Sequence, residues 1–254
     1  MLVDVGGRTL DVAVTPAAAP SPRPPLVFLH EGLGSIQQWR TFPSAVRTAV
    51  GGPAMLVYSR AGYGRSGPAE LPRPVDYMHE EADVVLPALL AHLDLQRPVL
   101  VGHSDGASIA LLHAGGGHDV AALVLLAPHV FVEDVSVASI AGARDAFATT
   151  DLPARLGRYH DDPEATFRGW NDVWLSPAFR SWNIEERLPA IRAPVPVVQG
   201  ADDPYGTTAQ LDAVGAGVPG PVERLVLPGV GHAPHLDAPE AVLRAVVGFV
   251  AGVS

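Results

Sequence analysis

The sequence predicts an α/β fold: a mostly parallel, eight-stranded sheet with helices on both faces. Short apolar runs alternate along the chain with longer stretches that could form helices. Runs that are apolar throughout are typical of parallel strands covered on both faces. The chain has 254 residues, of which 48% are hydrophobic and 17% are charged, so it can bury one large core.

The predicted strands begin with a hairpin. Residues 2–5 and 8–14 alternate in polarity on either side of Gly6 and Gly7, which favours a tight turn between two antiparallel strands. A Pro- and Ala-rich linker follows over residues 16–25. We expect six buried strands after it, over residues 26–30, 54–59, 98–101, 121–127, 195–199 and 222–227.

The stretches between these runs predict helices over residues 36–50, 76–93, 104–114, 207–216 and 239–250. One interval breaks the alternation, because residues 129–182 contain no strong strand and are rich in aromatic side chains. We therefore expect residues 129–183 to form a small helical cap inserted after the sixth strand. Residues 1–128 and 184–254 would form the core.

Composition excludes several classes of function. The chain has no cysteine, so disulfides, thiolate zinc sites and cysteine catalysis cannot operate. A net charge of −10 argues against nucleic acid or an anionic membrane as a partner. No segment approaches the about 18 continuous apolar residues of a membrane span, and the first residues contain no basic leader, so we expect a cytoplasmic protein. No pattern indicates an oligomeric state.

The segment Gly102-His103-Ser104-Asp105-Gly106 lies between a predicted strand and a predicted helix. A strand that turns abruptly into a helix places its central serine on a tight bend, and glycines two residues before and after leave room for that bend. A serine attacks only when a base accepts its proton and donors stabilise the resulting oxyanion. The segment alone is a weak signal, because short Gly-X-Ser-X-Gly patterns recur by chance.

A candidate acid and a candidate base follow later strands. The run 195–199 is followed by Asp202, Asp203 and Pro204, and the last run is followed by Gly231 and His232. The order Ser, Asp, His is the order in which an open sheet of this kind supplies a catalytic triad from its loops. The tight turn at Ser104, which we call the elbow, is a strong signal for nucleophilic catalysis when a candidate acid and a candidate base accompany it.

With these motifs the chain resembles the α/β-hydrolase fold superfamily, in its small capped serine esterase-like branch. The resemblance covers nearly the whole chain and includes the segments 30–35 and 62–66 after the third and fourth strands. It implies that Ser104 attacks, that His232 shuttles the proton and that Asp203 orients the imidazole.

The acid has alternatives. Asp203 is preferred over Asp202, because the acid of this superfamily usually lies three residues after the glycine and often precedes proline. Some relatives place the acid just beyond the sixth strand, where this sequence has Glu133 and Asp134.

The resemblance also implies an oxyanion hole made by the backbone N–H groups of Gly32 and Asp105. The usual His-Gly-X pattern is here His30-Glu31-Gly32, so Glu31 stands where a glycine is usual. Segment 62–66 is expected to be a structural turn that lines one wall of the pocket. The other expected pocket residues are Glu31, His129, Trp170, Trp174 and Tyr205.

A serine at the elbow, where some relatives have aspartate, argues against dehalogenase or epoxide hydrolase chemistry. We expect a serine hydrolase that cleaves a small-molecule carboxylic ester or thioester through an acyl-enzyme. Its partner would be a small acyl substrate, and neither a metal nor an organic cofactor is implied.

Three alternatives remain. The same triad supports hydrolytic C–C cleavage of a diketone-like ring-fission product, a lyase reaction without acylation, or a ligand-sensing module. An acidic ring-fission product could pair its carboxylate with arginines of the expected cap, which are Arg144, Arg155, Arg158, Arg168 and Arg180.

Overall fold

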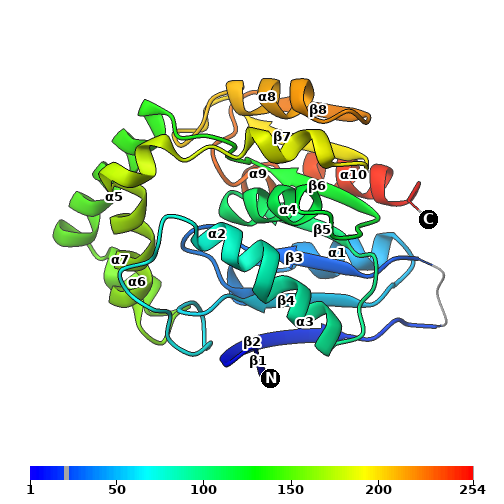
Figure 1. Cartoon of the computed structure of the whole chain (residues 1–254), viewed down its shortest axis with the longest axis horizontal. Coiled ribbons are helices and arrows are strands. Elements are labelled where there is room, and N and C mark those ends of the chain that lie inside the picture. The colour runs from blue at the N-terminus through cyan, green and yellow to red at the C-terminus, as the bar shows by residue number, and fades with distance from the viewer. Residues whose placement is uncertain (20–22, 254) are drawn as a thin grey trace.

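The computed structural model describes residues 1–19 and 23–253. One eight-stranded sheet runs through the molecule in the order β1-β2-β4-β3-β5-β6-β7-β8 (Figure 1). The β1–β2 and β2–β4 pairs are antiparallel and all the others are parallel, which confirms the predicted fold class. The strands are β1 (Leu2–Val5), β2 (Arg8–Thr15), β3 (Leu26–Leu29), β4 (Met55–Ser59), β5 (Val99–His103), β6 (Ala122–Leu126), β7 (Val195–Gly200) and β8 (Val222–Leu227).

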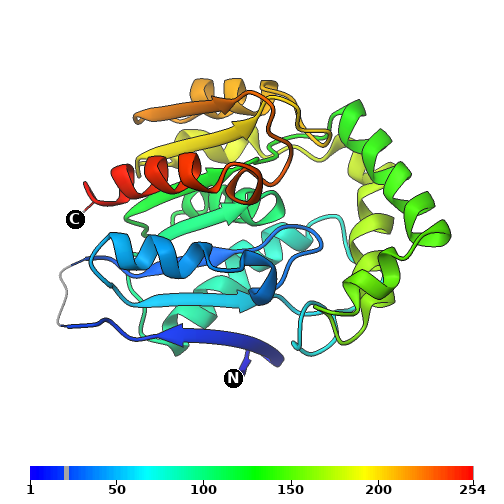
Figure 2. The same ribbon diagram turned by 180° about the vertical axis from the view of Figure 1, so that it is seen from behind.

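Helices cover both faces of the sheet. One face carries α1 (Phe42–Ala49) and α10 (Pro239–Val250), which lie in front in Figure 2. The other face carries α2 (Tyr77–Glu80), the π-helical segment η2 (Glu81–Val85), α3 (Leu86–His92), α4 (Asp105–Gly115) and α8 (Ala209–Gly217). The remaining short elements are η1 (Ile36–Trp39), η3 (Pro177–Ser181), η4 (Glu185–Ala190) and α9 (Pro234–Asp237).

The helix expected over residues 36–50 is interrupted. The 3-10 turn η1 ends at Trp39 and is followed by Arg40, and α1 begins at Phe42. The backbone of Arg40 has a φ of 52°, in the left-handed region that a continuous right-handed helix cannot include.

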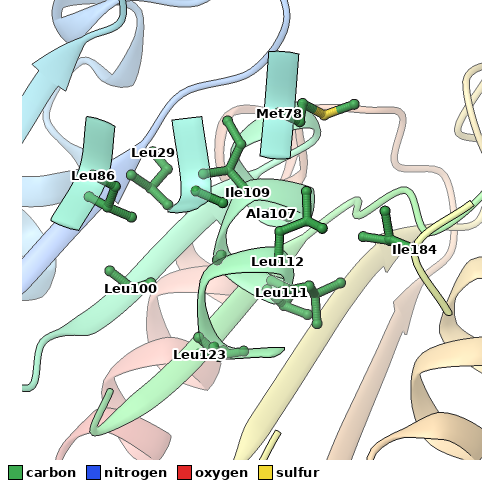
Figure 3. Close-up of a cluster of buried hydrophobic side chains, with 14 of the residues drawn as sticks. Leu29, Met78, Leu86, Leu100, Ala107, Ile109, Leu111, Leu112, Leu123 and Ile184 are labelled. Carbon is green, nitrogen blue, oxygen red and sulfur yellow. The ribbon is translucent and has the colours of Figure 1, made fainter. Parts of the chain in front are cut away.

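Helix α4 lies at the centre of the core. All its residues from Asp105 to Ala114 are buried, and most of them are apolar or small, as is typical of a helix in a protein core. Figure 3 shows Ile109, Leu111 and Leu112 of α4 among side chains from the strands and from the α2–α3 region. A Cβ added at Gly106 would lie 1.9 Å from the Leu29 carbonyl oxygen, so only glycine lets the first turn of α4 pack this closely against β3.

The expectation that every apolar run is a buried strand is wrong for β8. Its residues are half-buried or exposed, and Val226 is 39% exposed. The reason is position, since β8 pairs only with β7 and lies at the edge of the sheet.

Between β6 and β7 the chain forms α5 (Asp134–Thr149), α6 (Leu152–Leu156) and α7 (Pro163–Trp174). These helices lie together at one end of the sheet (Figures 1 and 2). The two ends of the segment meet, because Phe131 and Asn183 form a β-bridge and the N–H of Ile184 donates to the carbonyl of Val130. None of the helices in residues 1–19 and 23–253 is long and apolar enough to span a lipid bilayer.

A buried histidine of α4 makes the stability of the fold depend on pH. His113 is 1% exposed, its Nδ1–H donates to the carbonyl of Ala82 at 2.7 Å, and its ring stacks on His118. Burial lowers the pKa of His113 to about 4, whereas an unfolded histidine titrates near ~6.5. Between these two values the unfolded chain binds the proton and the native protein does not, so stability falls as the pH falls.

We expect His113→Gln to remove this contribution, because the amide can still donate to Ala82 but does not titrate. Urea unfolding at several pH values should show a loss of stability between pH 6.5 and 4 that is smaller than in the wild type by roughly 3 kcal/mol. His92→Gln, at an exposed position of α3, should leave the profile unchanged. Parallel profiles for His113→Gln and the wild type would contradict the prediction.

Candidate active site

Ser104 occupies a strained turn between β5 and α4. Its φ is 52° and its ψ is −117°, a conformation that is costly for any residue with a side chain. The turn is tight, because a Cβ added at Gly102 would lie 2.4 Å from the carbonyl oxygen of Gly106. The N–H of Ser104 donates to the carbonyl of Leu126 at 2.9 Å, which fixes the elbow to β6. The predicted elbow is therefore present, with both glycines required by close backbone contacts.

The Ser104 side chain lines a cavity of about 290 Å³, which we call the serine cavity. The cavity lies where the carboxyl end of β5 faces α5, α6 and α7, and it brings together residues far apart in the sequence. Five of the expected pocket residues lie in its wall: Glu31, His129, Trp170, Trp174 and Tyr205. The lining residues are Glu31, Gly32, Leu33, Gln38, His103, Ser104, His129, Ile140, Leu152, Arg155, Leu156, Trp170, Trp174, Tyr205, His232 and Ala233.

Asp203 faces His232 from the end of β7. The Nδ1 atom of His232 lies 2.9 Å from Oδ1 and 2.8 Å from Oδ2 of Asp203. The carboxylate also accepts hydrogen bonds from Gln199 Nε2 at 2.6 Å and from the Tyr205 N–H at 2.8 Å. These contacts hold the carboxylate in one orientation, so it can fix the proton on Nδ1 of His232 and leave Nε2 free to accept one.

Asp203 stays ionised in this setting. Burial acts to raise the pKa of Asp203, but the hydrogen bond and positive charge that His232 can supply outweigh it, and the pKa lies below its usual value. A permanent carboxylate beside the imidazole stabilises the protonated ring that forms during proton transfer.

The alternative acids do not reach His232. Asp202 is exposed. The carboxylate of Glu133 accepts hydrogen bonds from Thr207 and Gln210, and Asp134 forms an ion pair with Arg180.

Two neutral histidines lie beside His232. The ring centroids of His103 and His129 lie 5.1 Å and 5.7 Å from that of His232. Nε2–H of His103 donates to the carbonyl of His232 at 2.7 Å, which anchors the loop. Burial lowers the pKa of His129 to about 4 and that of His103 well below its usual value. At neutral pH both rings are uncharged, so neither repels a proton on His232.

The backbone N–H of Asp105 is available at the start of α4. As the first helical residue, Asp105 has no carbonyl four residues earlier in the helix to bond, and a helix N-terminus favours negative charge. Its side chain is turned into the core, where Oδ2 accepts a hydrogen bond from Tyr77 Oη at 2.7 Å and lies 3.6 Å from Nη2 of Arg60. Nε1 of Trp174 donates to the same Tyr77 oxygen at 3.1 Å. The Asp105 carboxylate thus faces Arg60 and Tyr77, and only its backbone is presented to the nucleophile.

The loop 30–34 contains Gly32, whose N–H is the second expected oxyanion donor. Within the described chain, the N–H of Gly32 donates no hydrogen bond. Glu31 stabilises the loop, since its Oε2 accepts a hydrogen bond from the Leu33 N–H at 2.7 Å. His30 braces the same loop, because its Nε2 accepts from the Arg60 N–H at 3.0 Å and its Nδ1–H donates to the Glu31 carbonyl at 2.7 Å. Burial raises the pKa of Glu31.

Gly32 also makes room for Trp170. A Cβ added at Gly32 would lie 2.3 Å from Nε1 of Trp170. We expect Gly32→Ala to push the loop and the indole apart and to displace the Gly32 N–H. Losing one oxyanion donor should lower kcat by about 10²-fold or more. Initial rates on a short p-nitrophenyl ester test this, with Gly142→Ala as the control, because a Cβ there meets nothing within 4 Å. An unaffected kcat in Gly32→Ala would exclude this N–H from the reaction.

Segment 62–66 is a structural turn, but it does not line the serine cavity, contrary to the expectation. Gly64 N–H donates to Nδ1 of His160 at 2.9 Å, and Arg65 forms an ion pair with the buried carboxylate of Asp11. Gly62, Gly64 and Ser66 line a separate small cavity. The turn tethers the sheet to the segment that follows α6.

Sequence reasoning missed the supporting residues of the site. Arg60, Tyr77 and Gln199 hold Asp105 and Asp203. Arg155, one of the cap arginines considered from the sequence, lines the serine cavity. Gln199 could have been suspected, because a polar residue near the end of an otherwise apolar strand needs a buried partner. Nothing in the sequence indicates Tyr77, since its partner is 28 positions away on another helix. Within residues 1–19 and 23–253, no three His, Asp or Glu side chains are grouped so that they could hold a metal ion.

Fold and sequence together define the class of protein. Residues 26–245 match the alpha/beta hydrolase family. The chain belongs to this family.

Solved structures agree with this assignment. The chain is similar to the enol-lactonase from Burkholderia xenovorans LB400, with 18% identity, a TM-score of 0.77, and coverage of 98% of this chain and 99% of that one. It is similar to a carboxylesterase structure from the thaumarchaeon Nitrososphaera gargenis (19%, TM-score 0.78, coverage 99% and 98%). It is also similar to a proline iminopeptidase from Mycobacterium smegmatis (20%, TM-score 0.74, coverage 98% and 97%). No curated protein sequence matches the chain.

Proposed function

We propose that the protein is a serine hydrolase that cleaves a small-molecule carboxylic ester or thioester through an acyl-enzyme. One observation carries the proposal: Ser104 on its strained elbow and His232, held by Asp203 at 2.8–2.9 Å, line the same cavity. A nucleophile, a base and an orienting carboxylate in this arrangement are the requirements for acyl transfer.

The reaction would proceed in two halves. Ser104 Oγ attacks the carbonyl carbon while its proton passes to Nε2 of His232. The N–H groups of Gly32 and Asp105 stabilise the tetrahedral oxyanion. Collapse breaks the bond to the alcohol or thiol, which leaves with the proton from His232. Water then attacks the acyl-enzyme, with His232 again as base, and the acid is released.

The apolar part of the cavity wall favours an apolar acyl group of limited size. It is formed by Ile140, Leu152, Leu156, Trp170 and Trp174, and the helices that carry these residues would act as the cap. Apolar walls with a few placed polar groups are typical of small-molecule sites. The structural neighbours include an enol-lactonase and a carboxylesterase. At this identity the likeness shows the fold alone, and the site residues support the proposed chemistry.

A fluorophosphonate probe tests the proposal. We expect the intact mass to increase by one adduct, located by peptide mapping at Ser104, together with turnover of short p-nitrophenyl esters and thioesters. A lyase of this fold would act on its substrate without the adduct, and a ligand-sensing protein would turn over neither kind of ester. Absence of both adduct and turnover would overturn the proposal.

A further inference from the structure

A second cavity of about 250 Å³ adjoins the serine cavity, and we call it the vestibule. The two share part of their walls, so one elongated molecule could occupy both. The shared residues are Glu31, Gln38, His103, Leu152, Arg155, Leu156 and Ala233.

The vestibule contains three arginines, Arg40, Arg155 and Arg158. Arg155 belongs to α6 and Arg158 follows it, whereas Arg40 comes from the core of the protein after η1. Separate parts of the fold therefore bring positive charge to one cavity, in a chain whose net charge is −10.

These three arginines differ from all the others in the chain. Counting only partners among residues 1–19 and 23–253, ten of the 17 arginines lie within 4 Å of a carboxylate, and Arg23, Arg47, Arg73 and Arg192 donate to backbone carbonyls. Within the described chain, the side chains of Arg40, Arg155 and Arg158 form no hydrogen bond or ion pair. The other cap arginines considered from the sequence are paired: Arg144 with Asp172, Arg168 with Glu164 and Arg180 with Asp134.

Two further observations point to a ligand. The backbone of Arg40 has a φ of 52°, where most residues other than glycine are disfavoured. The fold therefore keeps Arg40 in place at a cost in conformational free energy. The only carboxyl group of the described residues that lines either cavity is that of Glu31, and one of its oxygens is already bonded to the Leu33 N–H. The vestibule thus has unpaired cations and little anionic charge to neutralise them.

We propose that the vestibule binds an anionic group, a carboxylate or a phosphate, on the part of the substrate that extends out of the serine cavity. The scissile carbonyl would lie at Ser104, the apolar portion against the cap helices, and the anion between Arg155, Arg158 and Arg40. Guanidinium groups bind both kinds of anion through paired N–H donors. This inference rests on the proposed hydrolase function and names its substrate class.

Two matched substrate pairs distinguish the possible sources of the anion. The mono-p-nitrophenyl ester of adipic acid is compared with p-nitrophenyl hexanoate, which lacks the carboxylate on the acyl side. Hexanoyl-pantetheine 4′-phosphate is compared with hexanoyl-pantetheine, which lacks the phosphate on the leaving-group side. We expect the wild type to prefer the charged member of one pair in kcat/KM.

The double variant Arg155→Ala/Arg158→Ala should lower this charged-to-neutral ratio by about two- to fivefold per arginine, and Arg40→Ala should lower it further. Arg168→Ala is the matched control, since Arg168 lies on α7 and pairs with Glu164 outside both cavities. The proposal would be overturned if the wild type preferred the charged substrate in neither pair. It would also be overturned if Arg168→Ala lowered the charged-to-neutral ratio of kcat/KM as much as the double variant does.

A binding measurement separates this proposal from the hydrolase proposal. Calorimetric titration of Ser104→Ala with adipate and with pantetheine 4′-phosphate requires no turnover. We expect one of them to bind, more weakly at high salt and more weakly in the double arginine variant. Binding without ester turnover or a serine adduct would contradict only the hydrolase function. Ester turnover without binding or charge preference would contradict only the anion site.

Discussion

Ser104→Ala is expected to lower kcat/KM on the best ester by about 10⁴-fold or more, because no other group replaces the attacking oxygen. The oxyanion donors and the cavity remain in the variant, so KM should change much less than kcat. The variant should also give no fluorophosphonate adduct. Stopped-flow rates and intact mass measure both effects on the same preparation.

Ser108→Ala is the matched control for this prediction. Ser108 lies one turn further along α4, is buried, and donates its hydroxyl to the carbonyl of His129 at 2.6 Å. Its loss should cost about 1 kcal/mol of stability while the adduct at Ser104 still forms. Activity that survives Ser104→Ala but disappears in Ser108→Ala would refute the assignment of the nucleophile.

Asp203→Asn is expected to lower kcat by roughly 10³–10⁴-fold with the fold intact. Asn is almost isosteric with Asp, but the amide cannot accept from His232, Gln199 and Tyr205 as the carboxylate does. An amide N–H facing Nδ1 would favour the tautomer with its proton on Nε2, which cannot accept the proton of Ser104. The fluorophosphonate reaction should slow in parallel, because it uses the same base.

Asp202→Asn provides the comparison, because it makes the same chemical change one residue earlier. Asp202 is exposed and should tolerate the substitution with activity near that of the wild type. If Asp202→Asn were the inactive variant, the acid would have to be reassigned. Glu133→Gln addresses the other alternative, and we expect it to weaken the contacts with Thr207 and Gln210 without removing catalysis.

The identity of the fold and of the candidate triad could be predicted from the sequence. The alternation of short apolar runs and longer stretches indicated the parallel sheet, because strands buried on both faces must be apolar throughout. The glycines on either side of Ser104 indicated a tight turn in the same way. Positions 102 and 106 have no space for a Cβ. Only glycine fits there, so the residue type alone indicates the close backbone contact.

Other features depended on which residues meet in space. The run 222–227 was expected to be buried, but it forms the edge of the sheet and pairs with β7 alone. Its Glu223 and Arg224 are exposed there. Which of Asp202 and Asp203 faces His232 depended on one register step, and in the fold it is Asp203 that contacts the imidazole. Tyr77 and Arg60 support Asp105 from other elements, and no local pattern records such contacts.

The sequence by itself thus determined the family, the order of the candidate nucleophile, acid and base along the chain, and the glycines that shape the turn at Ser104, because each is encoded in local spacing or in backbone sterics. Only the tertiary structure decided which of the arginines are unpaired. All 17 look alike along the chain, and 14 of them find partners when the chain folds. The pairing of a charge depends on what lies within about 4 Å of it, and those neighbours come from distant parts of the sequence.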